Sequence, residues 1–214
     1  MSEKAIILFG SGSPLIVDYE EVCRLQKIKI SAVVNNVEGV KCQASSEVRQ
    51  VKTNQVLSLE TKLFISPLFT PYNRNIATNE AIDLGLEVLP YLIDSSALLP
   101  SNIKCGKGVF INKGVIIGAS SVIGNHVLIN RGATLGHHLR LEDYVSIGPG
   151  VTTGGNVTIG RGSMIGTGAT ILPTINIGKH AIIGAGSVVT KDVENNGVVV
   201  GNPARKIKSR NLNF

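Results

Sequence analysis

Two adjacent histidines, His137 and His138, are the residues of this 214-residue chain best suited to moving protons. They lie in the stretch GATLGHHLRLED and make up half of the four histidines in the chain. A neutral imidazole can take a proton from a nucleophile while a bond forms, because it titrates close to neutral pH. The pair is therefore a candidate general base, although two solvated polar residues would give the same sequence.

A six-residue repeat surrounds the histidines and must position them. Starting at Ile93 and stepping by six, fifteen of seventeen positions are Ile, Leu or Val, without an insertion: Ile93, Leu99, Cys105, Ile111, Ile117, Ile123, Ile129, Leu135, Leu141, Ile147, Thr153, Ile159, Ile165, Ile171, Ile177, Ile183 and Val189. Because six is even, these side chains point to one side of an extended chain, whereas a helical period would scatter them. Short strands and turns repeated in this way predict a β-helix, a coil of stacked parallel strands.

Two further columns follow the same period. The residue two places before the aliphatic is often small or β-branched, as at Val145 and Ala169, and is expected to pack beside the ladder. The residue after the aliphatic is often glycine, as at Gly118, Gly136 and Gly166. Glycine tolerates backbone angles that other residues avoid, so this column is expected to mark the turns.

This pattern resembles that of the hexapeptide-repeat acyltransferases, with [Leu/Ile/Val]-Gly-x-x-small-x repeats and a closing GNPA-[Lys/Arg] segment that matches VVVGNPARKI, residues 198–207. The resemblance covers about half the chain. It implies a left-handed parallel β-helix over residues 91–214, with a basic C-terminal tail. In that tail, Arg205, Lys206, Lys208 and Arg210 either form a solvated end or attract a phosphate-bearing ligand.

The first ninety residues predict a separate small α/β domain, residues 1–90. Strand-like runs at 5–9, 30–36 and within 61–69 alternate with a glycine-rich turn followed by a helix, and with a helix at 73–85. This order is typical of a Rossmann-like parallel sheet. The turn sequence GSGS is only part of a dinucleotide-binding fingerprint, and a tight turn without a ligand would also contain it.

The two-part layout is similar to that of the sialic-acid O-acetyltransferase and nucleotide-aminosugar N-acetyltransferase family. The resemblance implies that the first domain binds a sugar or nucleotide through six positions: Gly10, Ser11, Gly12, Ser13, Asn35 and Asn36. Two departures stand out. Pro14 occupies the place of a family histidine, and the two asparagines replace an acidic pair. Asparagine still forms hydrogen bonds with a ribose or base but carries no charge.

The same resemblance implies roles in the β-helix. His137 aligns with the catalytic histidine, and His138 replaces the acidic residue that would orient it; Asp143 or Glu142 either takes over that role or is a solvated turn residue. The implied acetyl-CoA contacts are Ser146 in place of a second family histidine, an oxyanion-stabilising amide at Gly155, the coenzyme groove at Thr167 and Ala185, and phosphate contacts from Arg205 and Lys206. Acetyl-CoA would lie between neighbouring β-helices of a homotrimer.

Composition excludes several other classes. Hydrophobic residues make up 43% of the chain and charged residues 17%, which predicts a folded protein. No apolar run reaches the roughly 20 residues of a membrane span. The three cysteines are widely spaced and predict neither disulfides nor a zinc site, as expected for a protein of the reducing cytoplasm. The chain has a net charge of +6, but its sequence shows neither the basic helix nor the aromatic platform of a nucleic-acid interface, so nucleic-acid binding is disfavoured. A zinc enzyme of the γ-carbonic anhydrase type is disfavoured because adjacent His137 and His138 do not easily share one tetrahedral site.

The sequence thus predicts an acetyl-CoA-dependent acetyltransferase without a metal. The expected acceptor is the amine of a nucleotide-linked amino sugar, a small molecule used in surface-glycan or glycoprotein biosynthesis. O-acetylation of a sugar such as sialic acid needs the same base and stays open. A trimer that binds a sugar nucleotide without catalysis is the third alternative, favoured by the replaced residues Pro14, Asn35, Asn36 and His138.

Overall fold

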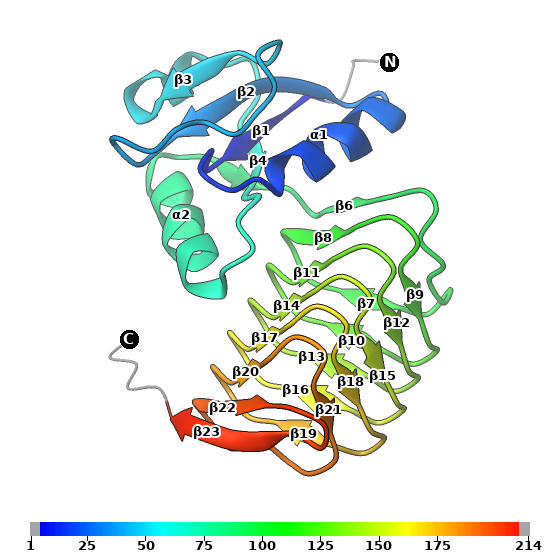
Figure 1. Cartoon of the computed structure of the whole chain (residues 1–214). Coiled ribbons are helices and arrows are strands. Elements are labelled where there is room, and N and C mark those ends of the chain that lie inside the picture. Colours follow the sequence, from blue (N-terminus) through cyan, green and yellow to red (C-terminus); the bar gives the residue numbers. More distant parts are fainter. Residues whose placement is uncertain (1–4, 210–214) are drawn as a thin grey trace. The chain divides into compact units, whose positions relative to one another are not determined.

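The computed structural model describes residues 5–209, and the chain divides into two compact units between Leu92 and Ile93 (Figure 1). The described part of the first unit contains β1 (Ala5–Phe9), α1 (Ile16–Leu25), β2 (Lys29–Asn35), β3 (Gln50–Lys52), the 3-10 helix η1 (Thr53–Ser58), β4 (Leu63–Ile65), α2 (Pro71–Asp83) and β5 (Glu87–Val88). The three strands and two helices expected from the sequence are confirmed, with shifted ends except for β1. Helix α2 begins at Pro71, a residue suited to a first helical position because it needs no amide donor there.

The sheet of the first unit is parallel, in the order β3-β2-β1-β4-β5. Alternate residues of β1 point to opposite faces, and both sets are buried. Ile7 and Phe9 pack in one cluster with Ala77 and Ala81 of α2. The strand order reverses between β1 and β4, and in open α/β sheets ligands bind at the carboxyl ends of strands at such a point.

The second unit is a left-handed parallel β-helix with three sheets (Figure 1), which confirms the β-helix predicted by the repeat and the hand implied by the resemblance. The first sheet contains β7 (Lys104–Cys105), β10 (Val122–Ile123), β13 (Arg140–Leu141), β16 (Thr158–Ile159) and β19 (Asn176–Ile177). The second contains β9 (Ile116–Ile117), β12 (Thr134–Leu135), β15 (Thr152–Thr153), β18 (Thr170–Ile171) and β21 (Val188–Val189). The third contains β6 (Tyr91–Ile93), β8 (Val109–Ile111), β11 (Leu128–Ile129), β14 (Ser146–Ile147), β17 (Met164–Ile165), β20 (Ile182–Ile183), β22 (Gly197–Val200) and the antiparallel β23 (Arg205–Ser209).

The strand register confirms the inward ladder. Ile123 pairs with Leu141, and Ile147 with Ile165, so residues 18 positions apart lie in neighbouring coils. From Ile111 to Val189 the ladder is buried, and the small column fills the core beside it. Thr153 is accommodated in the ladder because its hydroxyl accepts a hydrogen bond from the Gly136 amide at 3.0 Å.

The expectation for the glycine column is wrong in its physical reason. The left-handed backbone positions lie two residues further along, for example at Gly168 (φ 66°), His138 (φ 54°) and Tyr144 (φ 60°). The glycines directly after the aliphatics are needed because the next coil lies too close for a side chain. A Cβ on Gly166 would lie 2.5 Å from the Ala185 nitrogen.

Candidate active site

His137 and His138 lie together at the corner where β12 turns into β13. Their Nδ1 atoms are 2.9 Å apart, and the two rings are nearly perpendicular. Both residues are exposed. His138 occupies the left-handed position of the turn, where its amide donates to the Ala119 carbonyl in the preceding coil. The contact requires that one Nδ1 carries the proton and the other accepts it.

Gly155 lies beneath the His137 ring in the next coil. A Cβ added to Gly155 would lie 2.5 Å from both Cε1 and Nε2 of His137, so only glycine leaves room for the ring there. The two coils are also joined by the Asn156 amide, which donates to the His137 carbonyl at 2.9 Å. Within residues 5–209, the Gly155 amide has no hydrogen-bond acceptor. A base beside an open N–H donor is the arrangement that acyl transfer requires.

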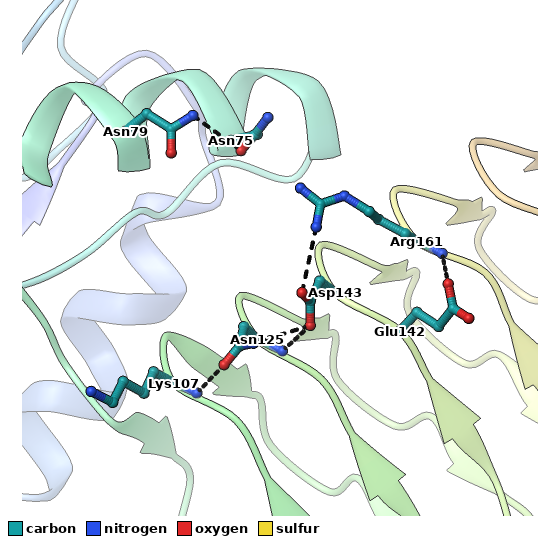
Figure 2. A network of polar contacts seen from close by, with 7 residues as sticks. All are labelled: Asn75, Asn79, Lys107, Asn125, Glu142, Asp143 and Arg161. Carbon is teal, nitrogen blue, oxygen red and sulfur yellow. Dashed lines mark hydrogen bonds and ion pairs between the residues drawn. The ribbon is translucent and has the colours of Figure 1, made fainter. Parts of the chain in front are cut away.

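Glu142 and Asp143 are not placed to orient His137. They lie at the following corner, where β13 leads to β14 (Figure 2). There Asp143 accepts from the Asn125 amide at 2.7 Å and pairs with Arg161 at 3.4 Å, while Glu142 accepts from the Arg161 amide at 2.9 Å. These carboxylates stabilise the stacking of neighbouring turns, so the structure favours the second of the two roles that the sequence left open.

Ser146 is not brought together with His137 within this chain. It lies on β14 in the sheet opposite the corner that joins β12 and β13, and it is fully buried. A buried hydroxyl on that side does not extend the site at His137. The resemblance gave Ser146 a position in the repeat but could not show that this position is buried.

Thr167 and Ala185 share a third corner, where β17 leads to β18 and β20 to β21. Both are exposed and lie on successive coils, joined by the Gly186 amide, which donates to the Thr167 carbonyl at 2.8 Å. The predicted coenzyme positions thus occupy a different corner from the predicted base. Within one chain, the corner that carries His137 and the corner that carries Thr167 and Ala185 are therefore separate.

Arg205 and Lys206 begin β23, so this part of the basic segment is an ordered strand, and all of its side chains are exposed. Lys206 Nζ lies 2.7 Å from Glu194 Oε2, and its hydrogen bond and charge hold the pKa of that carboxyl below its usual value. Arg205 donates to the Ala204 carbonyl at 3.0 Å. Both line an open cavity of about 320 Å³. Arg210 lies outside the described residues.

A pocket of about 570 Å³ lies at the carboxyl ends of β1, β2 and β4, where the strand order reverses. Its lining contains five of the six positions predicted for the first unit: Gly10, Gly12, Ser13, Asn35 and Asn36. Ser11 is the exception, since it is buried beside the pocket and its hydroxyl has no partner in the structure. The volume suits a small-molecule ligand.

The sequence did not identify the other side of this pocket. Leu68, Phe69 and Thr70 after β4, and Asn73, Ile76 and Ala77 of α2, form that side, and the rest of the lining is Pro14, Val37 and Val40. Buried Arg74 fixes this segment by donating to the Leu68 and Phe69 carbonyls. No local motif marks these residues; the one available signal was that β4 would lie beside β1 in a parallel sheet.

The described residues contain neither a candidate metal site nor a candidate membrane span. Residues 5–209 contain no group of three or more His, Cys, Asp and Glu side chains arranged to hold a metal ion. In the same range, no helix has the length and apolar character needed to cross a membrane.

Comparison with known proteins gives the wider context. The family model of the bacterial transferase hexapeptide (six repeats) matches residues 138–173 and 156–191. A variant of perosamine N-acetyltransferase from Caulobacter crescentus, solved with CoA and GDP-perosamine, is 25% identical with a TM-score of 0.87, over 98% of this chain and 99% of that one. The acetyltransferase domain of PglB from Neisseria gonorrhoeae, solved with acetyl coenzyme A, is 26% identical with a TM-score of 0.84, over 96% and 100%.

WeeI from Acinetobacter baumannii has the same fold at 23% identity, with a TM-score of 0.84 over 96% of this chain and 100% of that one. The search among curated proteins found no significant match. The repeat, the three-sheet β-helix and the whole-length likeness to two-domain acetyltransferases lead to one conclusion: this chain is an acyltransferase, similar over nearly its whole length to sugar N-acetyltransferases built on the same β-helix.

Proposed function

We propose that the protein transfers the acetyl group of acetyl-CoA to the amine of a nucleotide-linked amino sugar, in surface-glycan or glycoprotein biosynthesis. The observation that carries this proposal is the His137–His138 contact beside the open Gly155 amide. The whole-length likeness to an enzyme solved with CoA and GDP-perosamine supports both the acyl donor and the class of acceptor.

His137 is the general base of the proposed reaction. When its Nδ1–H donates to His138 Nδ1, its Nε2 is left with a free lone pair. The sugar amine attacks the thioester carbonyl carbon, and Nε2 takes the amine proton as the C–N bond forms. The Gly155 N–H stabilises the oxyanion of the tetrahedral intermediate. Collapse of the intermediate breaks the C–S bond, and the proton passes from His137 to the leaving thiolate.

His138 holds the imidazole of His137 in the productive tautomer. It accepts the Nδ1 proton but has no fixed negative charge to stabilise the imidazolium, which a carboxylate would supply. This predicts an enzyme that works with a weaker partner for its base, rather than one that has lost its chemistry. The coupled His137 and His138 side chains therefore act as one unit.

The pocket of the first unit binds the nucleotide part of the acceptor through Gly10, Gly12, Ser13, Asn35 and Asn36. Acetyl-CoA lies between β-helices of a homotrimer, where the corner with His137 faces the corner with Thr167 and Ala185 of a neighbouring chain. The separation of these two corners within one chain supports this arrangement. Arg205 and Lys206 meet a coenzyme phosphate, for which Lys206 must leave Glu194.

The deciding experiment is release of free thiol from acetyl-CoA against UDP-, dTDP- and GDP-linked amino sugars and sialic acid. Wild type and His137→Ala are compared, with His180→Asn as a histidine control at a corner away from His137. Turnover with an amino sugar that is lost only in His137→Ala supports N-transfer by this base. Turnover with sialic acid indicates O-transfer. Turnover that persists in His137→Ala removes His137 as the base, and coenzyme binding without turnover favours a binding protein.

A further inference from the structure

The pocket of the first unit has no charged side chain in its lining. Open α/β sheets that bind nucleotides usually place an acidic residue after the second strand, where it accepts hydrogen bonds from ribose hydroxyls. Here Asn35 and Asn36 occupy that place. Asn35 is used within its own loop, since its Nδ2 donates to the Val40 carbonyl and its Oδ1 accepts from the Val37 amide.

Asn36 instead contacts a carboxylate from a distant part of the chain. Its Nδ2 donates to Glu80 Oε2 at 2.7 Å, a short distance typical of a hydrogen bond to a charged acceptor. Glu80 lies on α2, four residues after Ile76 and three after Ala77, both of which line the pocket. Residues at these spacings share one face of a helix, so Glu80 lies at the edge of the pocket, outside its lining and in contact with Asn36.

The Asn36–Glu80 pair retains free acceptors. Both side chains are half-buried, and no hydrogen bond in residues 5–209 uses Glu80 Oε1 or Asn36 Oδ1. An ionised carboxylate has room for about four hydrogen bonds and donates none, which suits two neighbouring hydroxyl groups. The carboxylate missing after β2 is therefore supplied from α2.

We propose that Glu80, held by Asn36, accepts the 2′- and 3′-hydroxyl groups of a ribose, so that this protein uses ribonucleotide-linked sugars and discriminates against 2′-deoxynucleotide-linked ones. This inference rests on the proposed function, since it names the acceptor class for the same pocket. A 2′-deoxynucleotide offers one hydroxyl fewer and leaves a half-buried acceptor without that partner. GDP- and UDP-linked sugars are thus substrates, and dTDP-linked sugars are poor ones.

The test is calorimetric titration of the full-length protein with GDP, UDP, dGDP and dUDP. We expect wild type to bind the ribonucleotide of its preferred base about tenfold or more tightly than the 2′-deoxy form, as for a hydrogen bond to a charged group. Glu80→Gln should lose most of this ratio by weakening the ribonucleotide alone. The swapped variant Asn36→Asp/Glu80→Gln keeps one acid and one amide in contact and should restore it.

Asp83→Asn is the matched control, because it removes the same charge from an exposed position on the same helix. It should leave the ratio unchanged, and CoA binding should be equal in all variants. Equal binding of ribo- and deoxynucleotides by wild type, or an equal loss of both in Glu80→Gln, overturns the role of Glu80 while leaving the nucleotide pocket intact. Binding of none of the four probes by wild type overturns the pocket's proposed function and this inference together.

Discussion

The two units place their candidate functional residues in opposite ways. In the β-helix, residues 18 positions apart are neighbours, so the location of Gly155 beneath His137 follows from counting. In the α/β unit, the pocket is formed by three strand ends and a helix that are remote in sequence. A repeat therefore makes the position of each side chain predictable from its number in the sequence. The residues of a pocket where the strand order reverses come together only when the whole sheet is assembled.

The difference also determines how far a substitution reaches. A β-helix side chain meets the coil before and the coil after it, and the backbone there is fixed by ladders on both sides. The pocket of the α/β unit includes the exposed loop residues Val37 and Val40, which have room to move. The same chemical change should therefore cost catalysis or stability in the β-helix, and mainly ligand affinity in the α/β unit.

Gly155→Ala and Gly12→Ala make this comparison with one added methyl group each. At Gly155 the new Cβ would lie 2.5 Å from the His137 ring, and at Gly12 it would lie 2.6 Å from Val40 Cγ1. We expect Gly155→Ala to lower kcat about 100-fold, because displacing a catalytic group by about 1 Å has an effect of that order. Gly12→Ala should raise the KM for the nucleotide sugar and leave kcat unchanged.

Steady-state kinetics of thiol release measure both parameters, and thermal denaturation checks that both variants are folded. Each variant is the control for the other. A similar kcat for Gly155→Ala and wild type would mean that the position of the His137 ring over Gly155 is not the catalytic one.

The two glycine columns of the β-helix provide the next test. Gly166→Ala places a Cβ 2.5 Å from the Ala185 nitrogen, where backbone must shift, and should cost about 3 kcal/mol as overpacking does. Gly168→Ala enters open space at φ 66° and should cost about 1 kcal/mol for the left-handed backbone alone. Chemical denaturation at one fixed protein concentration measures both. Equal costs would contradict the assignment of the two columns to different constraints.

The sequence predicted most of the β-helix because each six-residue unit repeats one physical requirement, an aliphatic side chain pointing inward. It misassigned the purpose of the glycines, since a pattern of residue types does not distinguish a close approach from a positive φ. Position 138 illustrates the difference: histidine stands where the backbone is left-handed, which favours glycine or asparagine. The repeat tolerates that cost at several of its corners, including His126 and His180.

The candidate sites were predicted only where a motif carried them. His137 and His138 were found because histidine is rare in this chain and adjacent residues remain adjacent. Glu80 was missed because 44 positions separate it from Asn36 and nothing in the helix sequence distinguishes it from a solvated glutamate. Ser146 was assigned to the coenzyme by resemblance, and its burial could not be predicted because it depends on packing that the repeat does not specify.

Substitutions of His138 separate the charge of the partner from its hydrogen bond. The Oδ1 atoms of aspartate and asparagine take the place of histidine Nδ1, and both residues tolerate the left-handed backbone. We expect His138→Asp to raise kcat several-fold by stabilising the imidazolium, and His138→Asn to stay close to wild type. His138→Ala should lose about tenfold with the hydrogen bond. Equal kcat values in all three variants would show that His137 works without this neighbour.

Asn35→Ala tests the expectation that substitutions in the α/β unit mainly change ligand affinity. Asn35 closes its loop through the Val40 carbonyl and the Val37 amide, so its loss should free one wall of the pocket. We expect a KM for the nucleotide sugar about fivefold higher, the scale of one hydrogen bond, with kcat unchanged. Gln43→Ala is the control, since it removes a side-chain amide that donates to the nearby Lys41 carbonyl and keeps the backbone amide that donates to the Ser11 carbonyl. A fall in kcat rather than a rise in KM would mean that the loop contributes to more than binding.

The smallest expected effect is the loss of stability when one surface ion pair is removed from each unit. Lys29 lowers the pKa of Glu60, and Lys206 lowers the pKa of Glu194, in each case through a hydrogen bond and charge on an exposed carboxyl. A carboxyl whose pKa is lower in the folded than in the unfolded protein adds stability above its unfolded pKa, and that stability disappears as the pH falls through the folded pKa. Solvent screens both pairs, so Lys29→Gln and Lys206→Gln should lower the melting temperature only slightly at pH 7, by similar amounts, and not at all in acid. A larger effect of Lys206→Gln, persisting in acid, would mean that Lys206 holds β23 through its aliphatic stem rather than its charge, because packing does not titrate.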